Sequence, residues 1–160
     1  MDIVIFTTGG TIDKVYFDRQ SEFQVGSPQI AEVLGEANVT LDFEVVPLMR
    51  KDSLELTAED RAAIRAAVEA SPARRIVITH GTDTMVETAR ALLGIPDKVV
   101  VLTGAMQPAR FRTTDAVFNI ACAVTAAQLL PDGVYIAMNG RIFDPARTMK
   151  NVAMNRFELI

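Results

Sequence analysis

The chain has 160 residues, 49% of them hydrophobic, with a formal net charge of -4 and a pI near 5.0. That length can bury most of its surface around one core and is too short for two full-sized domains. The acidic balance, without any basic stripe, argues against a nucleic-acid partner, because such domains present a basic face to the phosphates.

Cysteine content and hydropathy indicate the cellular compartment. Cys122 is the single cysteine and lies in an apolar run, which excludes an internal disulfide and is typical of a small buried hydrophobe in a reducing compartment. The first residues do not form a basic segment followed by an apolar one, and no apolar run approaches the roughly 20 residues of a membrane span. We therefore predict a cytoplasmic protein without a membrane partner.

The hydrophobic pattern predicts the fold class. Near-continuous apolar runs rich in β-branched residues, which are typical of strands covered on both faces, occupy residues 2–6, 41–48, 75–79, 98–103 and 134–138. Helical patterns lie between them, at residues 28–35, 57–70, 84–93 and 114–129. The alternation predicts a single α/β domain with a mostly parallel sheet and helices on both faces, in a flavodoxin-like or Rossmann-like three-layer arrangement.

The first predicted strand ends in T-T-G-G-T-I at residues 7–12. Threonine is a poor turn former, so the glycines are expected to make the turn and the hydroxyls to face whatever lies above the strand end. The spacing fits neither G-x-G-x-x-G nor G-x-x-x-x-G-K-[ST], so no nucleotide cofactor is expected. Residues 13–27, which follow, have mixed polarity and are predicted to form an irregular loop that acts as a lid.

The ends of the later predicted strands carry hydroxyls, small residues and few acids. Their sequences are M-R-K-D-S at 49–53, T-H-G-T-D-T at 79–84, T-G-A-M-Q-P at 103–108 and M-N-G-R at 138–141. Because parallel strands share one carboxyl edge, where ligands bind, Thr11, Thr82 and Asp83 are expected to converge there. Gly10 and Gly81 would allow close approach of the backbone.

A threonine hydroxyl is nearly inert by itself, so a hydrolytic site also needs a base and donors for the developing oxyanion. The amide that follows Gly104, at Ala105, is a candidate donor. An alternative interpretation is that Thr82 and Asp83 only cap the helix that follows them. His80 is the single histidine and invites a role as general base, but its place at a strand end favours a structural one.

Three segments resemble those of the bacterial-type L-asparaginases. T-G-G-T-I at 8–12 and H-G-T-D-T at 80–84 look like the two signature segments of that family, and T-G-A-M-Q-P is similar to its T/V-G-A-M-R-P segment. The resemblance extends through nearly the whole chain but covers only the larger, N-terminal domain of the family. It implies that residues 1–160 form a short, one-domain version without the smaller C-terminal domain.

The resemblance implies an amidohydrolase that converts L-asparagine and water to L-aspartate and ammonia. No metal is expected either, because no cluster of His, Cys or carboxylate residues has the spacing of metal ligands. Matched by motif, Thr11 is the first nucleophile, Thr82 and Asp83 are its partners, and Lys150 is the catalytic lysine. Ser53 would bind the substrate α-carboxylate, together with Asp83 for the ammonium and the backbone at Gly10, Gly81 and Ala105. Tyr16 would supply the family's loop tyrosine, although it lies nearer to Thr11 than is usual.

The missing domain leaves two hypotheses open. In the full-length family a neighbouring subunit's small domain places an acidic residue near the substrate amine, so we expect a homo-oligomer in which a partner chain or another residue takes its place. The alternative is a non-catalytic amino-acid-binding or regulatory module that has kept the pocket. The presence of all four reactive residues favours the enzyme.

Overall fold

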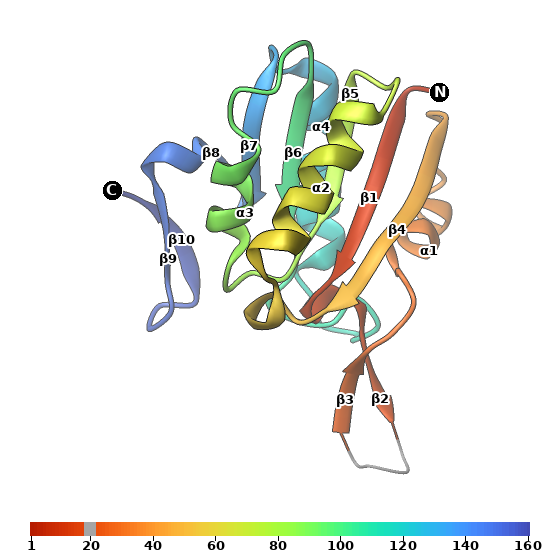
Figure 1. The fold of residues 1–160 in the computed structure, drawn as a ribbon. Coiled ribbons are helices and arrows are strands. Elements are labelled where there is room, and N and C mark those ends of the chain that lie inside the picture. Colours follow the sequence, from red (N-terminus) through yellow and green to blue (C-terminus); the bar gives the residue numbers. More distant parts are fainter. Residues whose placement is uncertain (18–21) are drawn as a thin grey trace.

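The computed structural model describes residues 1–17 and 22–160 and places a central sheet between two layers of helices (Figure 1). The sheet contains six strands of the described chain, in the order β4-β1-β5-β6-β7-β8. They are β1 Ile3–Gly9, β4 Phe43–Lys51, β5 Arg75–Thr79, β6 Val99–Thr103, β7 Gly133–Met138 and β8 Arg141–Phe143. All neighbours pair in parallel except β7 and β8, which confirms the predicted mostly parallel α/β sheet.

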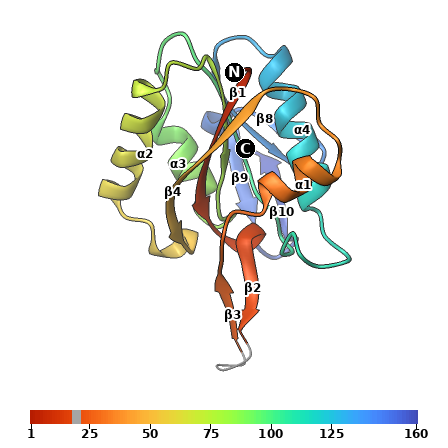
Figure 2. The ribbon, with the colours of Figure 1, turned by 90° about the vertical axis from the view of Figure 1, so that its right-hand side faces the viewer.

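The helices cover both faces of the sheet. Within the described ranges they are α1 Ile30–Glu36, α2 Ala58–Ala70, α3 Met85–Ala91 and α4 Ala116–Leu129. Figure 2 shows α2 and α3 on one side of the strands and α1 and α4 on the other. Each helix overlaps a predicted range, and α2 starts with a reciprocal cap in which Thr57 and Asp60 each bind the other's backbone N–H. None of these helices is long and apolar enough to cross a membrane.

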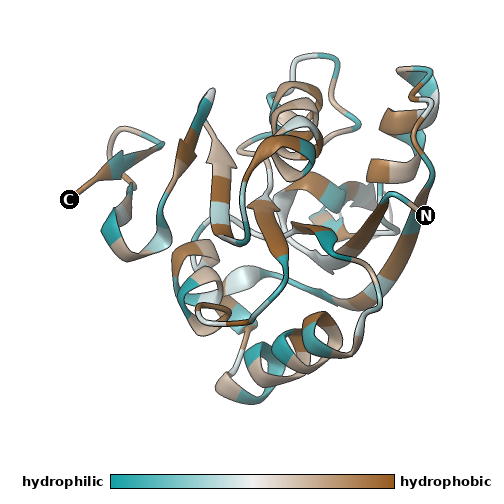
Figure 3. Cartoon of the chain, turned by 90° about the horizontal axis from the view of Figure 1, so that it is seen from above, coloured by the Kyte–Doolittle hydropathy of each residue, from teal (hydrophilic) through white to brown (hydrophobic). Residues whose placement is uncertain are grey.

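The sheet separates two hydrophobic cores. Along β1, Ile3 and Ile5 pack in the core beneath α1 and α4, whereas Val4 and Phe6 pack in the core beneath α2 and α3. Hydrophobic residues are correspondingly concentrated on the strands between the helices in Figure 3. A strand that is buried on both faces has no polar side, which explains why the strand segments of the sequence are almost continuously apolar.

Two antiparallel hairpins lie outside the main sheet. They are formed by β2 Lys14–Phe17 with β3 Glu22–Val25, and by β9 Thr148–Asn151 with β10 Arg156–Leu159. The expectation of an irregular loop at 13–27 is therefore wrong for its described part. Val15, Tyr16 and Phe23 favour extended backbone, but the hairpin buries neither face fully, so the sequence lacks the alternation that normally indicates a strand.

The winding of the sheet changes direction beside β1. The chain passes from β1 to β4 through α1 on one face and from β4 to β5 through α2 on the other, so β1 lies between β4 and β5. Open α/β sheets bind ligands in the crevice at such a point. The T-T-G-G-T-I segment leaves β1 and the H-G-T-D-T segment leaves β5 at this crevice.

Candidate active site

Three loops touch one another at the carboxyl edge of the sheet, and glycines make this possible. A Cβ atom on Gly10 would collide with the backbone of Gly81, and one on Gly81 would lie 2.6 Å from Cβ of Ser53. Gly10 also has φ of 88°, a conformation that side chains other than glycine rarely adopt. The turns that lead into Thr11 and Thr82 are thereby in contact, and Ser53 packs against Gly81.

Thr82, Asp83 and Lys150 form a connected group at this edge. The Lys150 ammonium donates hydrogen bonds to Oγ1 of Thr82, at 2.8 Å, and to Oδ1 of Asp83, at 2.6 Å. Thr82 is 6% exposed, and the Lys150 side chain is 11% exposed against 41% for Asp83. The ion pair is therefore buried on its Lys150 side and open to water on its Asp83 side. The structure thus joins three of the predicted catalytic residues.

Lys150 reaches this group from β9, 67 residues after Asp83 in the sequence. The side chain of Arg90, in α3, fixes the approach to β9 by donating to the carbonyl oxygens of Pro145, at 2.9 Å, and Thr148, at 3.2 Å. Helix α3 therefore holds both ends of the contact, because it also begins directly after Thr82 and Asp83.

The hydrogen-bond chemistry of Thr82 makes it suited to proton transfer. An ammonium group can only donate, so Oγ1 of Thr82 accepts from Lys150 and keeps its own hydroxyl proton for another acceptor. The capping alternative does not describe this geometry, since the N-cap of α3 is Thr84 and it makes no side-chain cap bond. The Thr84 hydroxyl instead donates to the Ser53 carbonyl, at 2.7 Å.

The three threonines of T-T-G-G-T-I have different environments. Thr7 is buried, and Thr8 donates to the carbonyl of Thr79 on the adjacent strand, at 2.9 Å. Thr11 opens a short 3-10 turn beyond the glycines and is partly exposed. It is therefore the hydroxyl of this segment that a ligand at the carboxyl edge can reach.

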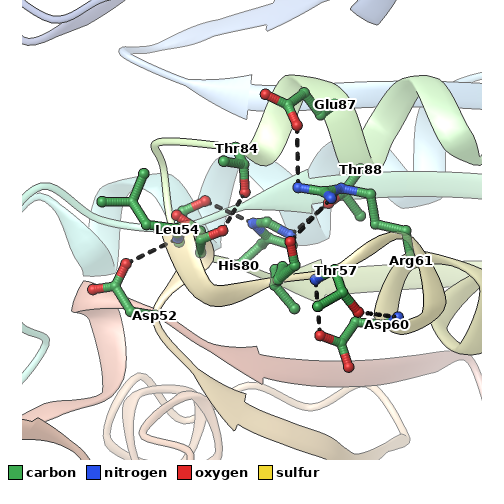
Figure 4. A network of polar contacts seen from close by, with 12 residues as sticks. Asp52, Leu54, Thr57, Asp60, Arg61, His80, Thr84, Glu87 and Thr88 are labelled. Atoms are coloured by element: carbon green, nitrogen blue, oxygen red, sulfur yellow. Dashed lines mark hydrogen bonds and ion pairs between the residues drawn. The ribbon is translucent and has the colours of Figure 1, made fainter.

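His80 is buried beneath the edge, in the network shown in Figure 4. Its Nδ1 lies 2.6 Å from the Gly81 carbonyl and its Nε2 lies 2.8 Å from Oγ1 of Thr88, which also accepts from Nε of Arg61. Because a carbonyl only accepts, Nδ1 carries the proton and Nε2 accepts from Thr88. Burial lowers the pKa of His80 to about 4, so the ring is neutral at pH 7. These contacts support the structural role predicted for it.

Ser53 lies in a 3-10 turn after β4 and is 2% exposed, whereas the next residue, Leu54, is 72% exposed. The Asp52 carboxylate accepts the Leu54 N–H at 3.1 Å and so fixes the turn. Ser53, the residue predicted to bind the α-carboxylate, packs against Gly81. An apolar side chain projects into water immediately beside it.

The T-G-A-M-Q-P segment is fixed from below by helix α4. The carboxylate of Asp115 accepts the backbone N–H groups of Met106 and Gln107, at 2.9 and 3.0 Å, and Asn119 donates to the Gly104 carbonyl, also at 2.9 Å. Ala105 is 1% exposed, so only its backbone could contribute to the site.

Two residues that contribute to this edge were missed from the sequence. Asp13, at the base of the β2–β3 hairpin, is 2% exposed and accepts the Gln29 N–H at 2.9 Å. Burial raises its pKa to about 6, against the opposing effect of that hydrogen bond. The sequence feature that could have pointed to Asp13 is its position directly after Ile12, an apolar residue.

The other missed residue, Asp115, had no such feature in the sequence, because the backbone groups that it binds can be identified only from the structure.

Tyr16 is placed differently from the other predicted residues. It is 52% exposed on β2, and its ring packs edge-on against Phe23 with a centroid distance of 5.5 Å. Phe23 in turn contacts Phe111, at 5.4 Å, which connects the hairpin to the loop after β6. In the described chain, Tyr16 is not part of the group formed by Thr82 and Lys150.

Residues 2–158 match the protein family described as Asparaginase, N-terminal. The L-asparaginase of Thermococcus kodakarensis is 32% identical over 168 residues, and that alignment covers all of this chain and 51% of the relative. One of the subunits of the glutamyl-tRNA(Gln) amidotransferase of Methanococcus vannielii is 44% identical over 91 residues, covering 56% of this chain and 20% of the relative.

Solved structures of L-asparaginases also superpose on this chain. The thermostable L-asparaginase from Thermococcus kodakarensis superposes with a TM-score of 0.87 at 30% identity, covering 100% of this chain and 51% of the other. A structure named as that of a probable cytoplasmic L-asparaginase, from Campylobacter jejuni, has a TM-score of 0.77 at 28% identity, with coverage of 99% and 51%. The chain thus spans about half the length of these relatives.

Proposed function

Because the chain belongs to the asparaginase family, whose N-terminal domain it matches over residues 2–158, we propose that it hydrolyses L-asparagine to L-aspartate and ammonia. The observation that supports this proposal most is the contact of the Lys150 ammonium with both Thr82 and Asp83, beside the turn that carries Thr11. Four residues from three segments, Thr11, Thr82 with Asp83, and Lys150, are assigned chemical tasks in this proposal.

Thr11 is the proposed nucleophile. Its Oγ1 attacks the side-chain carbonyl carbon of asparagine and forms an ester, while the C–N bond breaks. The hydroxyl gives up one proton and the nitrogen gains one, so the nitrogen leaves as ammonia with no net change in protons. Water then hydrolyses the ester, releasing aspartate and regenerating the hydroxyl. Thr82 and Lys150 supply the path for these protons, because the Thr82 hydroxyl accepts from Lys150 and donates its own proton outward.

Substrate orientation is assigned to Asp83 and Ser53. The Asp83 carboxylate is partly exposed and uses Oδ1 for Lys150, so we propose that its second oxygen binds the substrate ammonium. Ser53 would bind the α-carboxylate. The backbone N–H groups of Gly81 and Ala105 would supply donors for the oxyanion that develops during attack. Gly10 would contribute by its close approach to Gly81, because its own N–H donates to the Lys51 carbonyl at 2.9 Å. No step in this scheme requires a metal or an organic cofactor.

Two further elements complete the proposal. Tyr16 would contribute its hydroxyl when the β2–β3 hairpin approaches bound substrate, and a second copy of the chain would provide what the family's C-terminal domain provides in the longer relatives. The lone, partly buried Cys122 and the name of the Campylobacter jejuni relative support a cytoplasmic location.

The competing hypothesis is a non-catalytic module that binds amino acids. Ammonia release from asparagine, glutamine and a no-substrate control distinguishes the two. We expect turnover with asparagine, unchanged after chelation and dialysis, and a preference over glutamine of about 10-fold or more, because one methylene in a fixed pocket is worth roughly 1–3 kcal/mol. Binding of aspartate without any turnover would establish the module instead.

A further inference from the structure

A pocket lies between helix α1 and the loop that follows β6, on the α4 side of the sheet. Its volume is about 460 Å³, within the range of roughly 300–1,000 Å³ that is typical of small-molecule sites. One wall is formed by Gln29 and α1, and the other by residues 109–112. We call this space the α1 pocket. The group formed by Thr82, Asp83 and Lys150 takes no part in its lining.

The two walls of the α1 pocket carry opposite charges. The helix contributes the carboxylates of Glu32 and Glu36, and the loop contributes the guanidinium groups of Arg110 and Arg112. All four side chains are exposed. Within residues 1–17 and 22–160, the side chains of Glu32, Glu36 and Arg112 form no hydrogen bond or ion pair. A ligand with one anionic and one cationic group can therefore pair with both walls at once.

Apolar side chains lie between the charged ones. Val33 of α1 is 8% exposed, Phe111 of the loop is 39% exposed and Val117, at the start of α4, is 49% exposed. A ligand that is polar throughout would leave these side chains in contact with water. The lining is thus complementary to a ligand that carries an apolar group beside its two charges.

We propose that the α1 pocket binds a free amino acid with a large apolar side chain, such as leucine or phenylalanine. Its carboxylate pairs with the guanidinium groups of Arg110 and Arg112. Its ammonium pairs with Glu32 and Glu36, and its side chain packs against Phe111. Asparagine and aspartate have no apolar group to cover that ring, so the pocket selects a different amino acid from the proposed substrate and product.

Gln29 joins the two walls before any ligand binds. It is 4% exposed, its Oε1 accepts from Nε of Arg110 at 2.9 Å, and its Nε2 donates to the Ser27 carbonyl at 2.8 Å. A buried amide that is bonded at both ends holds the guanidinium of Arg110 at the pocket. Because Arg110 uses Nε for this bond, its Nη groups can bind a carboxylate.

Both walls also hold the turn that carries Thr11. From the α1 wall, the Gln29 N–H donates to the Asp13 carboxylate at 2.9 Å. From the loop wall, the Ala109 N–H donates to the Ile12 carbonyl at 3.0 Å. Ile12 and Asp13 are the two residues that follow Thr11, so each wall is attached directly to this turn.

A third contact reaches the β2–β3 hairpin. The ring of Phe111 packs against Phe23 of β3, with a centroid distance of 5.4 Å. A ligand that fixes the two walls relative to each other should therefore also stabilise the turn and the base of the hairpin. The pocket itself does not depend on the proposed activity, because it shares no residue with the candidate active site.

Calorimetric titration of the whole chain with leucine and phenylalanine tests the site. We expect saturable binding with a Kd of about 1 mM or tighter, which is ordinary for ligands of this size. N-acetyl-leucine lacks the ammonium and leucinamide lacks the carboxylate, so each should bind about 10-fold more weakly or worse than leucine. No saturable binding below about 10 mM, or equal binding of either analogue, would overturn the proposal.

Substitutions on the two walls test the location. Arg112→Gln and Glu36→Gln should each weaken leucine binding about 10-fold or more, because each removes one charged partner of the ligand. Arg147→Gln and Glu59→Gln are the matched controls, since both residues are exposed and lie outside the pocket, in the turn Pro145–Arg147 and in α2, and the Kd should not change. Circular dichroism verifies folding. Unchanged leucine affinity in both folded pocket variants would overturn the proposal.

Hydrogen exchange of the Gly26 amide, measured by NMR, tests the connection to the hairpin, because this N–H donates to the Asp13 carbonyl. Saturating leucine should slow its exchange about 3-fold or more in the wild type but not in Arg112→Gln. Unchanged exchange in the leucine complex would overturn the connection.

Lys150→Met separates this inference from the proposed activity. It removes a proposed catalytic group and should keep the leucine Kd of the wild type, whatever its turnover. Leucine affinity that falls with Lys150→Met would show that leucine binds at the candidate active site, and it would overturn the proposal.

Discussion

The two sides of the candidate site differ in how firmly they are held. On the β5 side, His80 is 0% and Thr82 is 6% exposed. His80 bonds to Thr88 of α3, which also accepts from Arg61 of α2, and Thr82 accepts from Lys150 of β9. On the β1 side, Thr11 is partly exposed and leads into a hairpin whose Tyr16 is 52% exposed. The residues proposed for binding and proton transfer are therefore preformed, while the proposed nucleophile, Thr11, lies next to an exposed hairpin.

Asp13 holds the β1 side in place. Its backbone carbonyl accepts the Gly26 N–H at 2.7 Å, which closes the base of the hairpin, and its carboxylate accepts the Gln29 N–H, which fixes the start of α1. Backbone N–H groups bonded in this way hold a turn without side-chain packing. The position of Thr11 thus depends on one buried acid, whereas that of Thr82 depends on a network.

The largest expected effect comes from the preformed side. Lys150→Met removes both contacts of the ammonium and should lower kcat for asparagine by about 10³-fold or more, since proton transfer is lost, while aspartate Kd changes little. Lys14→Met is the matched control, because it removes a lysine ion-paired with Asp52 at 3.3 Å near the same edge. Equal losses in the two variants would show that Lys150 acts only through general charge or folding.

A smaller effect is expected from closing the space between the two sides. Gly81→Ala would place a methyl group 2.6 Å from Cβ of Ser53 and push that turn away from the substrate position, raising KM for asparagine by about 10- to 100-fold. Gly35→Ala, in α1, meets nothing within 4 Å and should stabilise the helix by roughly 0.5–1 kcal/mol without changing KM. An unchanged KM in Gly81→Ala would show that Ser53 does not bind the substrate.

The two sides can also be compared through the pH dependence of the free energy of unfolding between pH 4.5 and 6.5. Each side has one buried group that titrates there, Asp13 on the β1 side and His80 on the β5 side. With its pKa raised to about 6, folded Asp13 holds a proton that the unfolded chain has released, so its contribution is lost as pH rises. With its pKa lowered to about 4, folded His80 stays neutral where the unfolded chain is protonated, so its contribution is lost as pH falls. In the wild type, the Asp13 contribution makes the free energy of unfolding fall with rising pH and the His80 contribution makes it rise, so the two effects oppose each other.

Asp13→Asn should therefore expose the His80 slope. We expect its free energy of unfolding, from urea titrations, to rise by ~2 kcal/mol more than that of the wild type between pH 4.5 and 6.5. The carboxyl pKa values of Asp60 and Glu158 are lowered by their Lys51 and Arg156 partners, so they titrate below this window. Asp97→Asn, at an exposed site, is the control. Parallel curves for wild type and Asp13→Asn would contradict the buried-acid account.

The smallest expected effect is on the hairpin. Tyr16→Phe keeps the ring contact with Phe23 and removes the hydroxyl, so kcat should fall by only about 3- to 10-fold, with the melting temperature unchanged. Steady-state kinetics on asparagine measures this. If kcat fell as much as in Lys150→Met, the Tyr16 hydroxyl would belong with the preformed groups. If kcat did not change, the hydroxyl would have no role in the reaction and Tyr16 would only pack against Phe23.

The contrast between the buried β5 side and the exposed hairpin also explains which parts of the structure could be predicted from the sequence. The buried strands and the β5 side were predictable because burial on both faces leaves continuous apolar runs, and because H-G-T-D-T lies at the end of one of them. The β2–β3 hairpin was not, since a half-exposed ribbon carries no strict alternation. The role of Asp13 and the networks under His80 and Gly104 depend on partners distant in sequence, which no local pattern indicates.

The central claim is that Thr11, on the open side, and Lys150, on the preformed side, act as one catalytic unit. A double-mutant cycle on kcat for ammonia release from asparagine, with Thr11→Val, Lys150→Met and the combination, tests it directly. Each single variant should lose about 10³-fold or more and the double variant little beyond that, because groups that act together are not additive. Wild-type turnover in both single variants, or losses that simply multiply, would contradict the account.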